Sequence, residues 1–539
     1  MARAAHQAAF AARLHELKER SGRSYQALGR RCGLSSSTLH RYCTGGGVPA
    51  EFAPVERLGR LCAASRSELA ELHRLWLFAR VQREVERTGE PQPPTPAADR
   101  PTPVPRRPSR RRVGAWRAGV GVALVVALMF GLVTAGRRVP EQVAAGTAGP
   151  VPMWTNKPIR VSREFVGVTK NAASPHMPQF GVGSLRLWDS GTRWHKLEPE
   201  RGRFEWFRLD RLVDPAVRAG VPVLLTLGGT PAWASPGGRE TRYGDGSRTS
   251  PPDDLADWER FVRELATAYR GRIAGYELWD TANQQQGYSG TAETLVAMTE
   301  RAGRVVKEVD PAATVVCPGM AELWAPGARQ WMERFAELGG YRHCDVLGVK
   351  LHPRQASDPP ESMLELATEI ERSLYRAGAQ ALPMWNMGQG FSTPLEQPLD
   401  PEPAADHAVR YYLVSLYAEY RRVFFYNWGS DRIPIVLQPD GGKPTRAARH
   451  VEELGSWLTD SQNTSCGQGS KVGLPDNVWR CGFTKGDERF DILWTDRGSA
   501  RLALPADVAA VEAIDGVSRT DRPSGSLDVT GRPVVLRLE

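Results

Sequence analysis

The stretch Gly275–Asn283, with the sequence GYELWDTAN, decides the fold of the larger part of this 539-residue chain. It opens as a short apolar run, Gly275–Asp280, and turns polar at its end, as a strand does when it leaves a sheet. Two amphipathic segments that predict helices flank it, Asp253–Tyr269 before it and Ala292–Val309 after it. A strand between two helices is the unit from which parallel sheets are built.

The same alternation extends outward from this stretch in both directions. Further strand-like runs lie at Glu164–Thr169, Ser184–Asp189, Val221–Leu227, Thr314–Pro318, Asp345–Leu351, Pro383–Met387 and Val423–Trp428, with helical segments between them. Eight strands with helical crossovers over about 290 residues predict a (β/α)8 barrel, whose functional groups lie at the C-terminal strand ends. A doubly wound sheet is the alternative, but no glycine-rich phosphate loop follows the first strand. Short alternating segments such as Phe490–Trp494 and Val534–Leu538 predict a small β domain after the barrel.

Aromatic and polar side chains gather where the barrel strands end. A tryptophan ring presents a flat apolar face and an N–H donor, which suit the C–H faces and hydroxyl groups of sugars. We therefore expect a carbohydrate-binding cleft here, although any one of these tryptophans could be an ordinary core residue. The candidate residues are Arg186, Trp188, Trp194, His195, Trp233, Trp279, Asn283, His352, Trp385 and Trp428.

Five stretches resemble the clan A glycoside hydrolases, most nearly family 39, which contains β-xylosidases and iduronidases. They are SLRLWDSGTRWHKLEPERGRFEWFRLD from residue 184, VLLTLGGTPAWAS from 223, YELWDTANQQQGYSG from 276, DVLGVKLHP from 345 and FFYNWG from 424. The resemblance covers about residues 160–539 and implies the barrel fold. Members of this clan hydrolyse glycosidic bonds with retention, using two glutamates about 5–5.5 Å apart at the ends of the fourth and seventh strands.

Both of these glutamates are absent from this chain. Thr281 stands at the acid/base position, and a hydroxyl group cannot protonate a leaving group. Gly388 stands at the nucleophile position, where no glycosyl-enzyme bond can form. Asp280 is the nearest carboxylate that could substitute. The resemblance therefore implies a glycosidase fold without its catalytic pair, which still binds carbohydrate.

An uncharged apolar run, Ala118–Gly136, precedes the barrel. A helix of this length spans the hydrocarbon layer of a bilayer, about 30 Å thick. Arginines crowd its N-terminal flank and only Arg137 and Arg138 follow it, so the N-terminus is expected in the cytoplasm. We expect a single-pass cell-membrane protein with an extracellular C-terminal domain. A cleaved secretory signal is the alternative, but such signals open a chain.

Charge and cysteine content divide at the same place. Residues 1–117 carry 22 Lys or Arg and 10 Asp or Glu, a net charge of +12, whereas the remainder carries 48 and 51, a net charge of −3. The basic part favours nucleic acid or anionic lipid as a partner.

Cys466 and Cys481 flank a Gly- and Asn-rich loop before a strand-like segment, and we expect them to form a disulfide, whereas no pairing is predicted for Cys317 and Cys344. Because the sequence has no metal-ligand spacing and no nucleotide loop, we expect no metal and no cofactor.

Residues 10–83 show short helical patterns separated by tight glycine turns. In the segment after Gly33, Ser35 is a natural N-cap, and Leu39 and Tyr42 point inward. Small polar and basic residues remain on the outer face of this helix, as in a helix that fits the major groove of DNA. They are Ser36, Ser37, His40 and Arg41.

The stretch SYQALGRRCGLSSSTLHRYCTGG from residue 24 resembles the Cro/Xre-type helix-turn-helix family, in the form common among actinobacterial regulators. The resemblance covers about residues 8–80. It implies that the four outer-face residues contact base edges or phosphates, with Arg30 and Arg31 near the DNA backbone. A helical protein-interaction module without DNA binding is the alternative.

The sequence therefore predicts a multidomain protein in six segments. They are an all-α helix-turn-helix domain at 1–85, a Pro- and Arg-rich linker at 86–112, a transmembrane helix at 113–137, a linker at 138–158, a glycoside hydrolase-like barrel at 159–460 and a small β domain at 461–539. We interpret it as a membrane-anchored transcription regulator whose partners are DNA, a glycan or cell-wall polysaccharide, and a second copy of itself. Homodimers suit such a regulator because they bind paired DNA half-sites. The alternatives are an active membrane-tethered glycosidase with non-standard catalytic residues and a structural envelope protein with a cytoplasmic interaction module.

Overall fold

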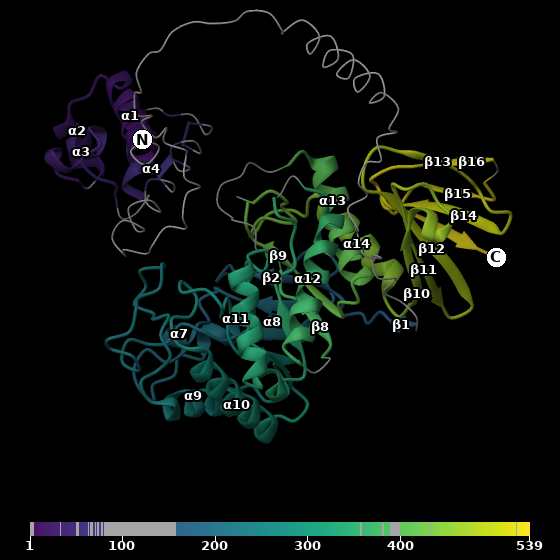
Figure 1. Ribbon diagram of the computed structural model, residues 1–539, viewed down its shortest axis with the longest axis horizontal. Helices are drawn as coiled ribbons and strands as arrows, with labels where there is room; N and C mark the ends of the chain where they lie inside the picture. Colours follow the sequence, from purple (N-terminus) through teal and green to yellow (C-terminus); the bar gives the residue numbers. More distant parts are fainter. Residues whose placement is uncertain are drawn as a thin grey trace, which may run out of the picture. The chain divides into compact units, whose positions relative to one another are not determined.

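The computed structural model describes residues 5–79, apart from 33, 50–52, 63, 65–67, 70–71, 73–74 and 77–78, and residues 158–539, apart from 356–357, 380–381, 389–398, 432 and 524. The chain divides into two compact units, Met1–Val151 and Pro152–Glu539 (Figure 1). The first unit is helical, and the second combines a barrel with a β domain.

The first unit contains a small helical domain. Its described helices are α1 (Ala5–Arg20), α2 (Tyr25–Cys32), α3 (Ser36–Cys43) and α4 (Ala53–Leu61). Leucines and cysteines from all four helices form one buried cluster, which includes Leu14, Leu28, Leu39 and Leu58. The turn after α2 passes so close to Gly29 that a Cβ there would lie 2.7 Å from the carbonyl oxygen of Leu34. A side chain at this position would therefore force α2 and α3 apart.

The second unit is built on the eight-stranded parallel barrel that the sequence predicts. The strands are β2 (Val166–Lys170), β3 (Ser184–Leu187), β4 (Val223–Thr226), β5 (Gly275–Glu277), β6 (Thr314–Val316), β7 (Leu347–Val349), β8 (Met384–Asn386) and β9 (Arg422–Trp428). They are ordered β6-β5-β4-β3-β2-β9-β8-β7. Two isolated parallel bridges, Val316 to Val346 and Met320 to Val349, close the seam between β6 and β7. Every barrel strand thus begins its following loop at the same end of the barrel.

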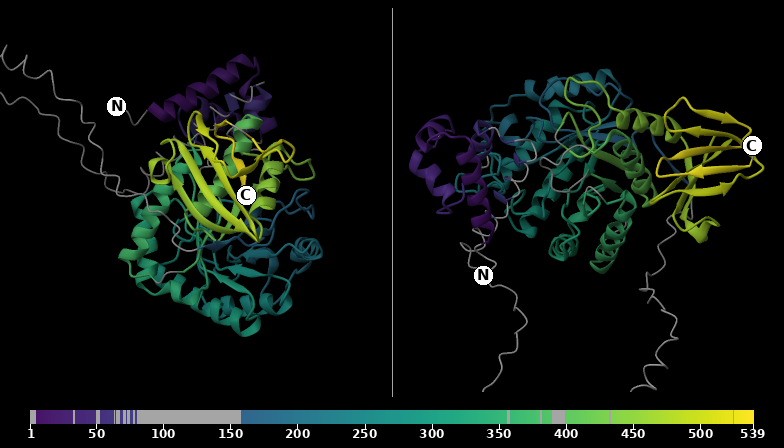
Figure 2. Two further views of the ribbon diagram at one scale, coloured as in Figure 1. Left: turned by 90° about the vertical axis from the view of Figure 1, so that its right-hand side faces the viewer. Right: turned by 90° about the horizontal axis from the view of Figure 1, so that it is seen from above.

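Helices cover the outside of the barrel (Figure 2). They are α7 (Trp194–Leu197), α8 (Phe207–Arg218), α9 (Leu255–Ala268), α10 (Ala292–Val309), α11 (Pro326–Glu337), α12 (Met363–Arg376), α13 (Pro401–Tyr417) and α14 (Arg446–Leu458), with the short 3-10 helices η2 (Gly340–His343) and η3 (Pro360–Ser362). Side-chain N-caps fix where several of them start: Asp254 caps α9, Thr291 caps α10 and Thr445 caps α14. Most of the core lies between the helices and the barrel wall.

A C-terminal β domain stands at one side of the barrel, beside α13 and α14 (Figures 1 and 2). Its main sheet has the order β1-β10-β11-β12-β17-β14-β15, and β13 pairs with β16 in a separate ribbon. The strands are β1 (Ile159–Arg160), β10 (Gln462–Gln468), β11 (Val478–Lys485), β12 (Glu488–Thr495), β13 (Ala500–Ala503), β14 (Val508–Ala513), β15 (Arg519–Asp521), β16 (Ser526–Val529) and β17 (Val534–Leu538). The indole N–H of Trp494 donates to Glu361, which also pairs with Arg410 of α13, so the domain is tied to the barrel by buried polar contacts.

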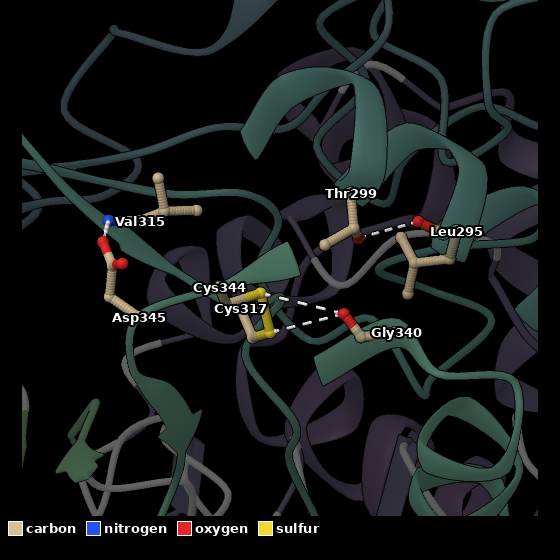
Figure 3. Close-up of a disulfide and its surroundings, with 7 residues drawn as sticks. All are labelled: Leu295, Thr299, Val315, Cys317, Gly340, Cys344 and Asp345. Carbon is tan, nitrogen blue, oxygen red and sulfur yellow. Dashed lines mark hydrogen bonds between the residues drawn. A yellow bond between two sulfur atoms is a disulfide. The ribbon is translucent and has the colours of Figure 1, made fainter. Parts of the chain in front are cut away.

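Two disulfides lie in the second unit. Cys466 of β10 is joined to Cys481 of β11, directly across the ladder. Cys317, which follows β6, is joined to Cys344, which precedes β7, so this disulfide fastens the barrel seam. Both of its sulfur atoms lie 4.0 Å from the carbonyl oxygen of Gly340 (Figure 3). Cys32, Cys43 and Cys62 of the first unit are buried thiols, so the two kinds of cysteine are segregated between the units.

The transmembrane helix expected at 113–137 and the single-pass localisation derived from it are contradicted. Within the described ranges, no helix is both long enough and apolar enough to cross a bilayer. A span needs about 20 mostly apolar residues, whereas α10, at 18 residues the longest of the described helices, carries acidic and basic residues along its length. The apolar run Ala118–Gly136 and the linker 86–112 lie outside the described residues. The described residues thus form a helix-turn-helix domain, a barrel and a small β domain.

Candidate functional sites

The outer face of α3 is the candidate nucleic-acid interface. The side chain of Ser35 caps the helix by accepting from the backbone N–H of Thr38 at 3.1 Å. Leu39 and Cys43 are buried beneath it. The residues predicted to face DNA are all exposed on this helix: Ser36, Ser37, His40 and Arg41. The cap and the buried face together fix which side of α3 is presented to solvent.

Two basic residues were expected near the DNA backbone at the end of α2. Arg31 is exposed there. Arg30 lies in the same helix, and its side chain is outside the described part of the structure. The ring of Tyr25, at the start of α2, meets the ring of His40 edge-on with centroids 5.1 Å apart. This contact restrains the His40 side chain on the outer face.

A buried cluster of charges fills the C-terminal end of the barrel. Arg186 at the end of β3 is fully buried, and its guanidinium donates to Glu277 at 2.8 Å and to Asp280 at 2.7 Å. Burial raises the pKa of Glu277. Burial acts in the same direction on Asp280, but the charges of Lys350 and Arg186 outweigh it and lower the pKa of that carboxyl to about 2. Asp280 is therefore an anion throughout the physiological pH range.

Lys350, which follows β7, completes this cluster. Its ammonium group donates to Asp280 at 2.9 Å and to the hydroxyl of Thr281 at 2.9 Å. Thr281 in turn donates to Asp280 at 2.6 Å. The backbone of Thr281 has a φ of 53°, which a β-branched residue rarely adopts. All three groups at the end of β5 and β7 are thus bound to one another.

Gly388, just after β8, has no room for a side chain. Its φ is 109°, a value that disfavours any residue but glycine. A Cβ at this position would lie 2.8 Å from the carbonyl oxygen of Phe424 and 3.0 Å from the Cβ of Tyr426. Both obstacles belong to the neighbouring strand β9, so neither can move aside as a flexible side chain could.

The ten residues expected to line a carbohydrate cleft divide by exposure. Arg186, Trp194, His195, Trp279, His352, Trp385 and Trp428 are buried, whereas Trp188, Trp233 and Asn283 are partly exposed. Trp194 stacks on Phe261 in the core, with ring centroids 4.9 Å apart. Trp428 is covered by the ammonium of Lys170, 4.1 Å from the ring centroid. These rings support the barrel wall, and a ligand would have to displace other side chains to reach them.

Other candidates are held by polar contacts of their own. The side-chain amide of Asn283 donates to the carbonyl oxygen of Ala321 at 2.8 Å and accepts from the backbone N–H of the same residue at 2.9 Å. Burial lowers the pKa of His352 and of His195 to about 4, so both imidazoles are neutral at pH 7. Trp188 is one of the two candidate tryptophans that remain partly exposed, the other being Trp233. Trp188 packs against the backbone of Gly228, where a Cβ would lie 3.4 Å from the ring.

Two residues of this region, Lys350 and Tyr243, were not predicted from the sequence as site residues. Lys350 stands in the stretch DVLGVKLHP, where a lysine at a strand end gave the only available signal. Tyr243 lies in the long loop between β4 and α9 and is 40% exposed. Nothing in the local sequence distinguishes this tyrosine from any other loop residue.

The first unit matches a known domain family. Residues 9–72 match the family of helix-turn-helix domains. This part of the chain is a helix-turn-helix domain. The match covers most of α1 and all of α2 to α4, and with them the exposed face of α3. No curated protein matches the chain.

The second unit resembles solved glycoside hydrolases. A family 39 glycoside hydrolase from the gut symbiont Bacteroides cellulosilyticus WH2 superposes with a TM-score of 0.53 at 18% identity, over 71% of this chain and 82% of that chain. A glucosidase from Croceicoccus marinus gives 0.51 at 15% identity, over 71% and 97%. A GH39 β-xylosidase from Caulobacter crescentus gives 0.51 at 12% identity, over 71% and 98%. Identities this low establish the fold alone, a glycoside hydrolase-like barrel.

Proposed function

We propose that this protein is a DNA-binding regulator whose glycoside hydrolase-like barrel binds carbohydrate without hydrolysing it. The helix-turn-helix domain supplies the DNA-binding face on α3. The barrel supplies the carbohydrate site at its C-terminal end. Occupation of the barrel would change the regulator's state, for example by altering self-association, since dimeric helix-turn-helix proteins bind paired half-sites.

The geometry at Gly388 is the main observation that argues against hydrolysis. The family resemblance assigns the nucleophile to this position, and the backbone there cannot take a side chain, a carboxylate included, without strain. A retaining glycosidase needs a carboxylate that attacks the anomeric carbon. At the acid/base position, the Thr281 hydroxyl is bound to Asp280 and Lys350 and has no acidity near neutral pH.

The remaining carboxylates at this end of the barrel are poor substitutes. Asp280, with a pKa of about 2, holds no proton to donate at neutral pH, and both of its oxygens accept bonds from Arg186, Lys350 or Thr281. Glu277 is fully buried behind Arg186. These contacts weigh against the active-glycosidase alternative, in which Asp280 performs catalysis.

Carbohydrate binding is supported by what remains accessible. Trp188, at the end of β3, is partly exposed, and the side chain of Lys350, which follows β7, is 14% exposed. An aromatic face combined with a few fixed hydrogen-bond donors is the usual composition of a sugar site. The cluster of Arg186, Asp280 and Lys350 holds such donors in place without a ligand.

The experiment that tests this proposal uses the full-length protein in three assays. Aryl glycosides of several sugars report hydrolysis, a glycan array reports binding, and selection from a random duplex DNA library reports sequence-specific DNA binding. We expect no turnover above background, binding to at least one class of glycan and enrichment of a defined DNA site. Turnover that disappears in the Asp280→Ala variant would instead establish an active glycosidase. An empty glycan array together with an unenriched DNA library would refute the proposal.

A further inference from the structure

Tyr243 is exposed and yet held in place. Its ring is 40% exposed, although a tyrosine in a long loop can usually turn freely. The guanidinium of Arg193 lies 3.9 Å from the ring centroid and covers one face. The guanidinium of Arg242 lies 5.5 Å from the same centroid. Two guanidinium groups thus restrain the ring, while 40% of the residue stays exposed to solvent.

The group that holds the ring is itself fixed. Arg193 is nearly buried, and its guanidinium pairs with Asp189 at 3.0 Å and with Asp245 at 2.5 Å. Asp245 also accepts from the hydroxyl of Ser247 at 2.6 Å. Asp189 follows β3, whereas Asp245 and Ser247 belong to the same loop as Tyr243. Arg193 therefore fastens this loop to the end of the barrel.

The open ring borders the barrel site. Burial raises the pKa of Asp189, and the charge of Asp280 acts in the same direction, so the two carboxylates lie within electrostatic range of each other. Burial raises the pKa of Tyr426, near the end of β9, and the charges of both carboxylates act in the same direction. Tyr243 is thus linked through Arg193 to Asp189, the neighbour of Trp188 in the loop that follows β3.

From this arrangement we infer that Tyr243 is an outer sugar-binding platform, and that the ligand of the barrel is a chain of several sugar units. The inference rests on the proposed carbohydrate binding and names the class of ligand. A sugar ring stacks its C–H face on an aromatic ring, and a ring already immobilised loses little entropy when it does so. One unit lies at the barrel end beside Trp188 and Lys350, and a further unit of the same chain lies on the open face of Tyr243.

The test compares short and long oligosaccharides. Full-length protein is titrated with cello-, xylo- and chito-oligosaccharides of two and of six units, and dissociation constants are measured by calorimetry. We expect Tyr243→Ala to weaken binding of the six-unit chain about tenfold, which corresponds to about 1.4 kcal/mol, and to leave the two-unit chain unchanged. Tyr243→Phe keeps the ring over Arg193 and is expected to bind within threefold of wild type. Tyr375→Ala removes an 88% exposed tyrosine of α12 and serves as the matched control.

Two outcomes would overturn the inference, and they are distinguishable. If wild type binds an oligosaccharide and Tyr243→Ala binds the long chain with unchanged affinity, the platform is refuted while the proposed carbohydrate binding stands. If wild type binds none of these chains and no glycan of the array, the proposed function itself fails, and the inference fails with it. Equal melting temperatures of Tyr243→Ala and wild type ensure that a loss of binding in Tyr243→Ala is judged on a folded protein.

Discussion

The strongest prediction concerns the substitution of Gly388. A Cβ here would lie 2.8 Å from the carbonyl oxygen of Phe424, and the backbone φ of 109° disfavours any L-residue. The conformational cost is about 1–3 kcal/mol, and forcing an extra carbon into a packed site costs typically about 1–3 kcal/mol more. We therefore expect Gly388→Ala to reduce the free energy of unfolding of the barrel by about 2–6 kcal/mol.

A matched control separates these two contributions. Gly202 also has a positive φ, 78°, and a Cβ there would meet nothing within 4 Å. Gly202→Ala therefore carries the conformational cost without the steric one. Guanidinium unfolding followed by tryptophan fluorescence reports both variants. The reasoning would be refuted if Gly388→Ala proved no more destabilising than Gly202→Ala.

The same geometry predicts that the missing catalytic pair cannot be restored. The double variant Thr281→Glu and Gly388→Glu places a glutamate at each position that the family resemblance assigns to catalysis. Because the second side chain has no space, we expect no hydrolysis of aryl glycosides and a lower yield of folded protein. Measurable turnover by this variant would show that the barrel end is more adaptable than its backbone indicates.

Three further predictions follow from other contacts. Asp280→Asn leaves Arg186 and Lys350 short of a buried partner and should destabilise the barrel by about 3–5 kcal/mol. The folded pKa of Asp280, about 2, lies below its ordinary value, so the stabilisation by this carboxylate is present above about pH 4 and is lost as the pH falls toward 2. The stability of the variant should therefore depend less steeply on pH over that interval than the stability of wild type. Replacing Cys317 and Cys344 together by serine should cost about 2–4 kcal/mol in thermal or denaturant unfolding, and an unchanged midpoint would contradict the role of this disulfide at the seam. Arg41→Ala should weaken binding to the selected DNA site and reduce the dependence of log K on log salt by about 1, and an unaltered salt slope would remove Arg41 from the phosphate contacts.

The barrel could be predicted from sequence because its signal is repeated. Each strand, such as Gly275–Glu277, is a short apolar run between amphipathic helices, so an error in one element does not change the topology. The turn of the helix-turn-helix domain was equally visible, since Ser35 and Leu39 occupy a cap and a core position of the same helix. Local patterns were sufficient in both cases.

The direction of individual side chains could not be predicted in the same way. Trp194 and Trp428 stand close to strand ends, as cleft residues would, yet both are buried in contacts with Phe261 and Lys170. A shift of one residue along a strand turns a side chain to the opposite face, and the sequence does not fix that register. Tyr243 was missed for the converse reason, because its neighbours in space, Asp189 and Arg193, are far from it in the chain.

The pairing of Cys317 with Cys344 illustrates a third limit. The two residues are 27 positions apart and meet only because the seam between β6 and β7 closes the barrel. Closure of the barrel depends on the whole sheet, so no local sequence pattern predicts it. Cys466 and Cys481, by contrast, face each other on neighbouring strands of one hairpin, which the sequence already indicated.

The place where the second unit begins has a mechanical consequence. Its first strand, β1, adds only two residues to the edge of the C-terminal sheet, pairing with Gln462 and Asn463 of β10. Tension applied through the preceding chain would therefore peel β1 away first, at the expense of few hydrogen bonds. The chain runs from β1 directly to β2 of the barrel, so the load would then pass to Val166 and not to β10. Detachment of β1 would thus leave the disulfide-bonded strands β10 and β11 in place, while the pull moves to the first strand of the barrel.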